Sequence, residues 1–189
     1  MRTTVLASVI TCLVIASART SVGQTAMARV SESPIVSVSQ QPNACARSER
    51  YRDLDFWVGT WAAAPWGSPP GTRNATSVVQ AMLDTCLVLE NYNGRGYEGK
   101  SFNYYDPNLD RWRQVWVDNG GTISDVVGGV RDGVFQLVGE GFNPRGVKIT
   151  RRMTLRRIAA DTLRHTWEAS ADGGKSWATV ADVRYTRER

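Results

Sequence analysis

The stretch Asp55-Phe56-Trp57-Val58-Gly59-Thr60-Trp61 decides the fold. An apolar lead-in meets a Gly-x-Trp element, and a strand-like run of three alanines follows directly. Glycine at this point lets the chain turn sharply into its first strand. A large ring such as that of Trp61 can then fill the tapering end of a small barrel. The stretch therefore predicts the opening of a closed β-barrel.

The rest of the chain alternates between apolar and polar residues with a period near two. We expect strands at about 58–65, 75–83, 86–92, 99–106, 111–118, 122–130, 133–138, 147–158, 162–169 and 176–186. Hairpin-type sequences such as Asn119-Gly120-Gly121 and Asp172-Gly173-Gly174 separate several of them. No helical pattern interrupts this series. The spacing predicts an all-β fold, a single antiparallel up-and-down barrel of about ten strands.

The N-terminus has the features of a secretory signal peptide over residues 1–18. A short basic start precedes an uncharged apolar run at 5–17, and Ala16-Ser17-Ala18 fits a cleavage site. The run is too short for a membrane span, so we expect no stable membrane insertion. Residues 19–44 are rich in Ser, Thr, Gln and Val and are predicted to be a disordered leader. The barrel domain then covers residues 45–189 of an exported protein, in the periplasm or outside the cell.

The chain carries a formal net charge of +5, which is a mild basic excess. The pairs Arg151-Arg152 and Arg156-Arg157 lie in one expected strand, where neighbouring residues point to opposite faces. Only half of these arginines can then contribute to one surface. Nucleic-acid binding requires a larger basic excess with aromatic groups on the same platform, so it is not expected.

Two cysteines, Cys45 and Cys86, remain once the signal peptide is removed. An even count in an exported chain predicts a disulfide, which would tie the end of the leader to the barrel wall. The alternative is two separate thiols, with Cys86 packed in the core. Two sulfurs and one histidine do not make a dedicated zinc site, and no metal is predicted.

Several strands place aromatic and polar residues on the face that should point inward. These faces comprise Trp112, Gln114, Trp116 and Asp118; Leu163, His165, Trp167 and Ala169; and Val147, Ile149, Arg151, Met153, Leu155 and Arg157. A barrel lined in this way commonly encloses a cavity, although a filled core with polar groups at the rims is the alternative. We expect a small amphipathic ligand to contact Trp112, Gln114, Trp116, His165 and Trp167.

His165 is the only histidine of the chain. A catalytic histidine needs an orienting acid and a nucleophile within reach, and no Gly-x-Ser-x-Gly element is present. A hydrogen-bonded wall residue or a ligand contact is the favoured interpretation. The alternative function is an isomerase- or hydrolase-type enzyme in which His165 acts with Glu90, Asn103 or Gln114. No cofactor is predicted, and haem ligation by His165 is a weaker alternative.

The segment Ser170-Ala171-Asp172-Gly173-Gly174-Lys175-Ser176-Trp177 matches the S-x-D-x-G-x-x-W pattern of a tight hairpin. In that pattern the aspartate accepts backbone N–H bonds and the tryptophan packs beneath the turn. A single copy predicts a structural turn and carries no information about substrate.

Several blocks together resemble a family of exported bacterial proteins that open with a DFW-x-GTW motif and to which no activity is assigned. The blocks are Cys45, the 55–61 stretch, Asp84-Thr85-Cys86-Leu87-Val88-Leu89-Glu90-Asn91, Gly99-Lys100-Ser101-Phe102-Asn103-Tyr104-Tyr105-Asp106, Trp112-Arg113-Gln114-Val115-Trp116-Val117-Asp118 and the 167–177 segment. The chain departs from the pattern at Thr85, where glycine is expected, and at Tyr92, where tryptophan is expected. The resemblance covers residues 45–185 and implies a calycin-like barrel, akin to lipocalins, fatty-acid-binding proteins and nitrobindin.

The resemblance also implies a role for the Gly-x-Trp tryptophan. In lipocalins this ring packs under a basic residue of the last strand, so Arg184 or Arg187 is expected to form a cation–π contact with Trp61 as the barrel plug. The function expected for the chain is that of an exported small-molecule-binding barrel. The oligomeric state is left open.

Overall fold

The computed structural model describes residues 44–143 and 145–188. These residues comprise a barrel and the short segment that precedes it. The expected signal peptide and all but the last residue of the expected leader lie outside the described residues.

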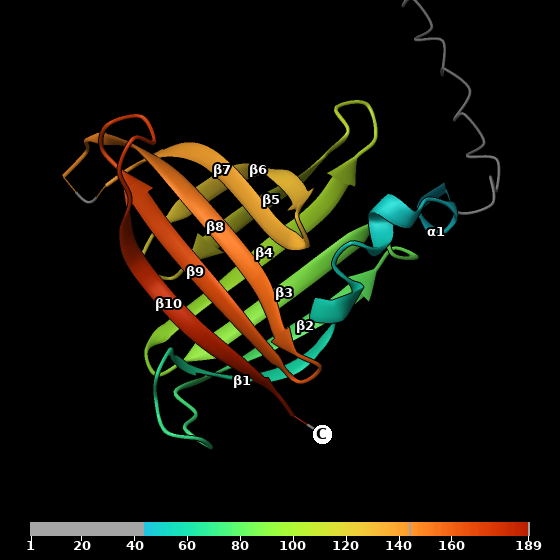
Figure 1. The fold of residues 1–189 in the computed structure, drawn as a ribbon, viewed down its shortest axis with the longest axis horizontal. Coiled ribbons are helices and arrows are strands. Elements are labelled where there is room, and N and C mark those ends of the chain that lie inside the picture. Colours follow the sequence, from blue (N-terminus) through green and yellow to red (C-terminus); the bar gives the residue numbers. More distant parts are fainter. Residues whose placement is uncertain (1–43, 144, 189) are drawn as a thin grey trace, which may run out of the picture. The chain divides into compact units, whose positions relative to one another are not determined.

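Ten antiparallel strands form a closed barrel (Figure 1). The strands are β1 (Gly59–Pro65), β2 (Ala75–Met82), β3 (Leu87–Gly94), β4 (Tyr97–Asp106), β5 (Arg111–Asp118), β6 (Ile123–Arg131), β7 (Val134–Phe142), β8 (Lys148–Ala159), β9 (Thr162–Ser170) and β10 (Ala178–Arg187). Each strand pairs with its neighbour in the chain, and β10 pairs with β1 to complete the ring. The predicted all-β, up-and-down architecture is confirmed.

The strand bounds follow the sequence pattern closely, and the largest difference is at the end of β7. We expected this strand to end at Val138, before the glycines at 139 and 141. Both glycines instead remain in the ladder, where Gly139 pairs with Arg151 and Gly141 with Ile149. The pairing partner on β8 is long and regular, and it holds these residues extended.

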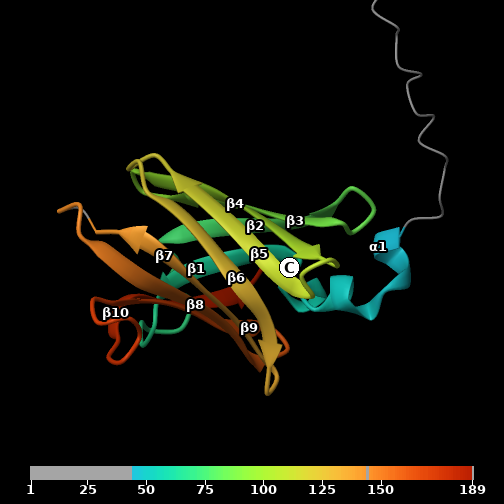
Figure 2. The same cartoon turned by 90° about the horizontal axis from the view of Figure 1, so that it is seen from above.

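A short helical segment covers one end of the barrel (Figure 2). It consists of α1 (Ala44–Arg47) and the 3-10 turns η1 (Glu49–Arg52) and η2 (Asp55–Trp57). Leu54 and Trp57 are fully buried beneath it and pack into one cluster with Trp61 and Trp112. We call this the closed end. The strand turns at 83–86, 107–110, 132–133 and 160–161 surround it.

Arg187 completes the closed end. Its guanidinium carbon lies 4.1 Å from the centre of the Trp61 ring, and the group donates to the carbonyl oxygens of Val58 at 2.8 Å and Phe56 at 2.9 Å. Trp61 Nε1 in turn donates to the carbonyl oxygen of Trp57 at 2.7 Å. The last strand is thereby joined to the first strand and to the turn before it.

The expectation that named Arg184 for the barrel plug is wrong, and its alternative Arg187 takes that position. Arg184 donates to the carbonyl oxygens of Ser68 and Pro69, outside the barrel. The reason is strand alternation. Tyr185 is buried in the core, so position 187 shares its inward face and position 184 does not.

Gly59 makes the contact of Arg187 with Trp61 possible. Its φ of +141° is a backbone conformation that side chains disfavour, and a Cβ added there would lie 2.2 Å from an Arg187 nitrogen. The glycine of the Gly-x-Trp element therefore supplies both the turn and the space for the guanidinium.

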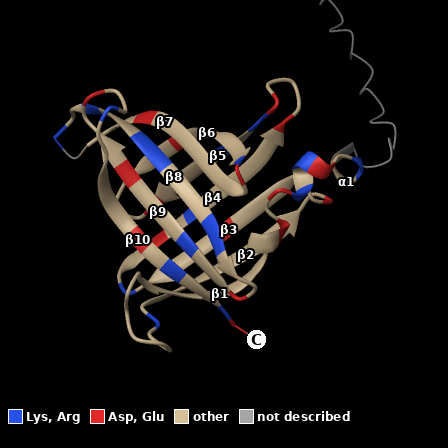
Figure 3. Ribbon diagram, viewed as in Figure 1, with Lys and Arg blue, Asp and Glu red and all other residues tan. Residues whose placement is uncertain are grey.

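Charged residues lie along β8, β9 and β10 (Figure 3). Several of these side chains form ion pairs between neighbouring strands. Arg152 on β8 pairs with Glu168 on β9 through two hydrogen bonds, and Arg164 on β9 pairs with Asp182 on β10 in the same way. Arg152 thus points outward, while its neighbour Arg151 points into the barrel. Within the described ranges, no helix is long and apolar enough to cross a membrane.

The predicted disulfide between Cys45 and Cys86 is present, with its two Cα atoms 5.1 Å apart. Cys86 precedes β3 at the closed end, and Cys45 belongs to the helical segment. The bond therefore fastens the segment that fills the closed end to the barrel wall.

Removal of this disulfide should lower the free energy of unfolding by about 3–4 kcal/mol, because it closes a loop whose ends are 41 residues apart. Denaturant unfolding of the protein with both residues replaced, Cys45→Ser/Cys86→Ser, measures the loss. Reducing agent should cause the same loss in the unsubstituted protein and none in the variant. An unfolding midpoint that does not respond to either change would contradict this assignment.

Candidate functional site

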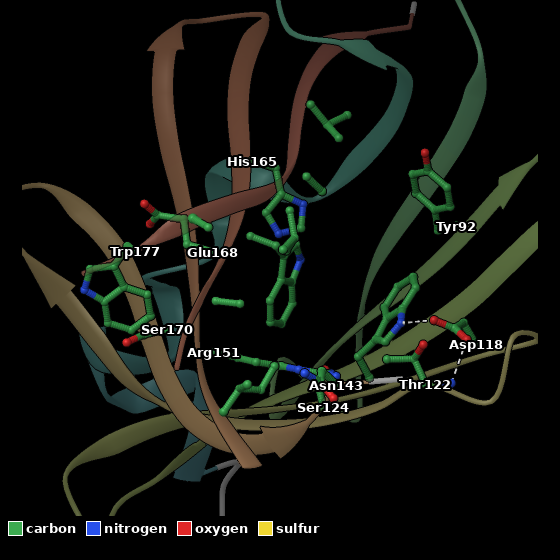
Figure 4. Close-up of a pocket in the computed structure, with 18 of the residues that line it drawn as sticks. Tyr92, Asp118, Thr122, Ser124, Asn143, Arg151, His165, Glu168, Ser170 and Trp177 are labelled. Atoms are coloured by element: carbon green, nitrogen blue, oxygen red, sulfur yellow. Dashed lines mark hydrogen bonds between the residues drawn. The ribbon is translucent and has the colours of Figure 1, made fainter. Parts of the chain in front are cut away.

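A cavity of about 830 Å³ lies inside the barrel at the end away from the helical segment. Residues near the strand connections at this end line its outer part, among them Asp118, Thr122, Asn143 and Trp177. Inward-facing residues of β3, β9 and β10 form its deepest part. Figure 4 shows the side chains that project into this space.

The walls of the cavity are mainly apolar. Three indole rings, those of Trp116, Trp167 and Trp177, line it together with aliphatic side chains such as Ile149 and Val183. Such walls provide contact area for an apolar ligand without fixing its orientation.

Three of the five residues expected to contact a ligand, Trp116, His165 and Trp167, line the cavity. Trp112 and Gln114 do not line it, although they lie on the expected inward face. Trp112 is fully buried and donates from Nε1 to the Asp53 carboxylate at 3.1 Å. These two positions lie further toward the closed end, where side chains fill the barrel.

Trp116 lies flat against the backbone of β4. A Cβ built on Gly99 would come within 2.1 Å of its ring, so the ring occupies the space that a side chain at position 99 would need. Trp116 Nε1 also donates to Asp118 at 3.0 Å, and the Tyr97 hydroxyl donates to the same oxygen at 2.9 Å. The ring position is therefore set by one glycine and one carboxylate.

Asp118 stays charged in this setting. Burial raises the pKa of its carboxyl, but hydrogen bonds from Trp116, Thr122 and Tyr97 outweigh that effect and bring the pKa below its usual value. The cavity thus has a carboxylate near its open end, with its oxygens engaged by neighbouring donors.

We call Glu90, Tyr185 and His165 the cavity floor, because all three line its deepest part. Glu90 is only 1 % exposed and accepts hydrogen bonds from Ser77 at 2.8 Å, Ser101 at 3.1 Å and Tyr185 at 3.1 Å. The Tyr185 oxygen lies 3.3 Å from His165 Nδ1, and the two rings stack. The floor is a continuous polar chain from β3 through β10 to β9.

Burial dominates the titration of all three floor residues. It raises the pKa of Glu90, against the effect of the three hydroxyl donors. It raises the pKa of Tyr185 well above the usual value, and the nearby Glu90 charge adds to the shift. It lowers the pKa of His165 to about 4, so the imidazole is neutral at physiological pH.

Beneath the floor, a second set of buried polar side chains supports Ser101. Asn103 donates to the Ser101 hydroxyl at 2.9 Å and to the carbonyl oxygen of Val88 at 3.0 Å, and Gln114 donates to Asn103 at 2.7 Å. Ser101 accepts from Asn103 and keeps its own hydrogen for Glu90. These residues fix the floor from below.

Arg151 projects into the cavity from β8, in line with its predicted inward face. Its guanidinium donates to the backbone carbonyl oxygens of Ile123 at 3.2 Å and Phe142 at 2.8 Å and also to the Ser124 hydroxyl. Within residues 44–143 and 145–188, no carboxylate forms an ion pair with it. Arg151 is thus a positive group on the wall that is held by neutral acceptors.

The 170–177 turn has the structure that its sequence predicts. Asp172 accepts the backbone N–H groups of Lys175 and Ser176, both at 2.9 Å, and the hydroxyls of Ser170 and Ser176, each at 2.6 Å. The Ser170 hydroxyl and then the Ser176 hydroxyl do most to hold the pKa of Asp172 far below the usual value. The turn places the Trp177 ring at the cavity, with Arg152 stacked 4.0 Å from the ring centre on the other side. The turn therefore builds part of the cavity mouth.

The sequence analysis placed His165 on the wall and, in the alternative function, combined it with Glu90, but it missed Tyr185, which links the two. Glu90 and His165 are 75 positions apart in the chain, on β3 and β9, and Tyr185 joins them across the barrel. The one available signal was alternation. Positions 185 and 187 share a face, so the inward assignment of Arg187 would also have placed Tyr185 inside.

No group of three or more His, Cys, Asp or Glu side chains in the described part of the chain is arranged to hold a metal ion. Comparison with models of known protein families and with curated proteins found no match to this chain. The membership of the DFW-x-GTW family therefore stays a prediction. The closed ten-strand barrel is consistent with the calycin-like architecture that this resemblance implies.

Replacing Gly99 by alanine should push the Trp116 ring into the cavity, because the new Cβ would overlap the ring. We expect a changed near-ultraviolet circular dichroism spectrum with unchanged far-ultraviolet strand signal. Gly129→Ala on β6 is the matched control, since its backbone is ordinary and a Cβ there would meet its nearest atom, a nitrogen of Arg50, at 3.9 Å. Identical near-ultraviolet spectra of Gly99→Ala and the parent protein would refute the close contact.

The buried His165 should make the protein less stable as the pH falls from about 6.5 to about 4. In this range the unfolded chain binds a proton on the imidazole and the folded protein does not, so protonation favours unfolding. One pKa unit corresponds to about 1.4 kcal/mol, and the full effect is therefore roughly 3 kcal/mol. Replacing the only histidine, His165→Gln, removes the effect.

The measurement is the difference in unfolding free energy between the two proteins at several pH values. Glu90 and the other carboxyls titrate in both proteins, so the difference isolates the imidazole. A difference that stays constant between pH 7 and pH 4 would show that His165 titrates normally in the folded protein.

Proposed function

We propose that this protein is an exported barrel that binds a small amphipathic molecule in its cavity. The observation that carries the proposal is an 830 Å³ cavity with three indole rings on its walls and a polar floor of three hydrogen-bonded side chains. Ligand pockets for small molecules commonly have about 300–1,000 Å³, with mainly apolar linings and a few placed polar groups. The Cys45–Cys86 disulfide supports export, since such bonds persist in oxidising compartments.

The division between wall and floor supports an amphipathic ligand over a fully apolar or fully polar one. The apolar body would contact the tryptophan rings, and a polar group would reach the floor. Burial of about 300 Å² of apolar ligand surface contributes roughly 7 kcal/mol before the cost of association. A dissociation constant in the micromolar range is therefore a reasonable expectation.

The geometry favours binding over the alternative enzyme based on His165. Asn103 and Gln114 lie beneath the floor, where they bond to each other and do not line the cavity. Glu90 contacts Tyr185 and two serines, and its hydrogen-bond partners do not include the imidazole. The residues expected to assist His165 in catalysis thus form hydrogen bonds with other side chains of the barrel and none with the imidazole.

Titration with medium-chain alcohols, fatty acids and retinoid-like probes should quench tryptophan fluorescence with saturation, because Trp116, Trp167 and Trp177 line the cavity. Ala181→Phe places a ring in the cavity and should weaken binding at least tenfold. Thr186→Phe, on the outward face of the same strand, is the matched control and should bind as the parent does. Absence of saturable quenching by every probe would overturn the proposal.

A further inference from the structure

His165 lines the cavity floor and carries a ring nitrogen that the protein leaves without a hydrogen-bond partner. The side chain is 7 % exposed, and its Nε2 atom is buried with no hydrogen-bond partner among the described residues. A buried polar atom without a partner costs free energy, so an unpartnered nitrogen on a residue that lines a cavity points to a group that arrives with the ligand. The chemistry of that group follows from the proton that His165 carries.

The direction of the hydrogen bonds in the floor is set at Glu90. Ser77 and Tyr185 surround one carboxyl oxygen and Ser101 the other, and all three are hydroxyl donors. Ser101 accepts from Asn103 and donates its own hydrogen to Glu90. Three converging donors fit a carboxylate that accepts at both oxygens.

This arrangement fixes the tautomer of His165. Tyr185 has one hydroxyl hydrogen and gives it to Glu90, so toward His165 its oxygen can only accept. The imidazole must then carry its hydrogen on Nδ1. A neutral ring with a hydrogen on Nδ1 has a lone pair on Nε2, which is an acceptor.

We propose that the ligand carries an uncharged hydrogen-bond donor, of which an aliphatic or phenolic hydroxyl is the simplest, and that this group enters first and donates to His165 Nε2. This inference rests on the proposed binding function and narrows it to a ligand class. The apolar remainder of the molecule extends toward the mouth along Trp116 and Trp167. His165 is the residue that selects the ligand. Tyr185 and Glu90 hold the His165 ring in position.

A carboxylate is disfavoured at the floor. It has no hydrogen to give to Nε2, and its negative charge would enter the neighbourhood of the Glu90 carboxylate at low dielectric. The positive group of the cavity, Arg151, pairs with Ala169 on the neighbouring strand, whereas His165 lies four positions further along that strand. Four positions of a strand correspond to about 13 Å, so an anion on Arg151 would leave the floor acceptor unfilled.

The first experiment compares three probes of equal size by fluorescence titration: undecanol, decyl methyl ether and decanoate. Undecanol should bind at least tenfold more tightly than the ether, because only the alcohol can donate to Nε2, and decanoate should bind more weakly than undecanol. Equal affinities for alcohol and ether, or tightest binding of decanoate, would overturn the inference while leaving a binding cavity. Failure of all three to bind would instead count against the proposed function itself.

Variants connect the preference to the floor. His165→Leu should abolish the preference for alcohol over ether, with both probes still bound through the walls. Tyr185→Phe removes the acceptor for Nδ1–H and should reduce the preference. Thr186→Val, on the outward face of β10, is the control and should preserve the preference. A preference that survives in His165→Leu would refute the assignment.

A measurement on the unsubstituted protein keeps the inference testable even if a floor variant fails to fold. The chain has one histidine, so ¹⁵N-labelled protein gives a single imidazole spectrum. We expect a protonated Nδ1 and an unprotonated Nε2 near neutral pH, with the Nε2 signal shifting on addition of undecanol but not of decyl methyl ether. A hydrogen on Nε2, or the same Nε2 shift with both probes, would show that the floor does not select a donor.

Discussion

The contact between Arg187 and the Trp61 ring is the interaction on which the rest of the structure depends. It joins the last strand to the first and to the carbonyl groups of the turn before it, and it exists only because Gly59 leaves space for the guanidinium. A cation over an indole face contributes about 0.5–2 kcal/mol, more when it is shielded from water. The contact also fixes the position of β10 against β1, where the ring of strands closes.

The barrel is filled at one end and holds a cavity at the other. Leu54, Trp57 and Trp112 occupy the closed end, and the buried amides of Asn103 and Gln114 form a layer above them. The polar floor rests on that layer. Beyond the floor, side chains line the cavity without filling it. The cavity therefore has a bottom that is held by hydrogen bonds from several strands. A floor held in this way would lose little conformational freedom if the proposed ligand entered.

The fold could be predicted from the sequence because its signals are local. Alternation marked ten strands, and the Gly-x-Trp element marked the start of the barrel. The inward faces of β5 and β9 followed from the same alternation, and they include Trp116, His165 and Trp167. The position of a residue along the barrel axis could not be predicted, since alternation shows which face a side chain is on but not how far it lies from the closed end. For that reason Trp112 and Gln114 were expected in the cavity and lie below it, and the link of Tyr185 to Glu90 depended on which strands meet across the barrel.

The pairing of β10 with β1 has a consequence for how copies of this protein meet one another. An open sheet ends in a row of unsatisfied backbone groups that can recruit a strand from a second molecule. In a complete ring those groups are used internally, and no such row remains among the ten strands. Copies of the barrel can then approach one another only through side chains and turns. The ring needs the contact of Arg187 with Trp61 at its closure, and once closed it offers no strand edge to a second copy.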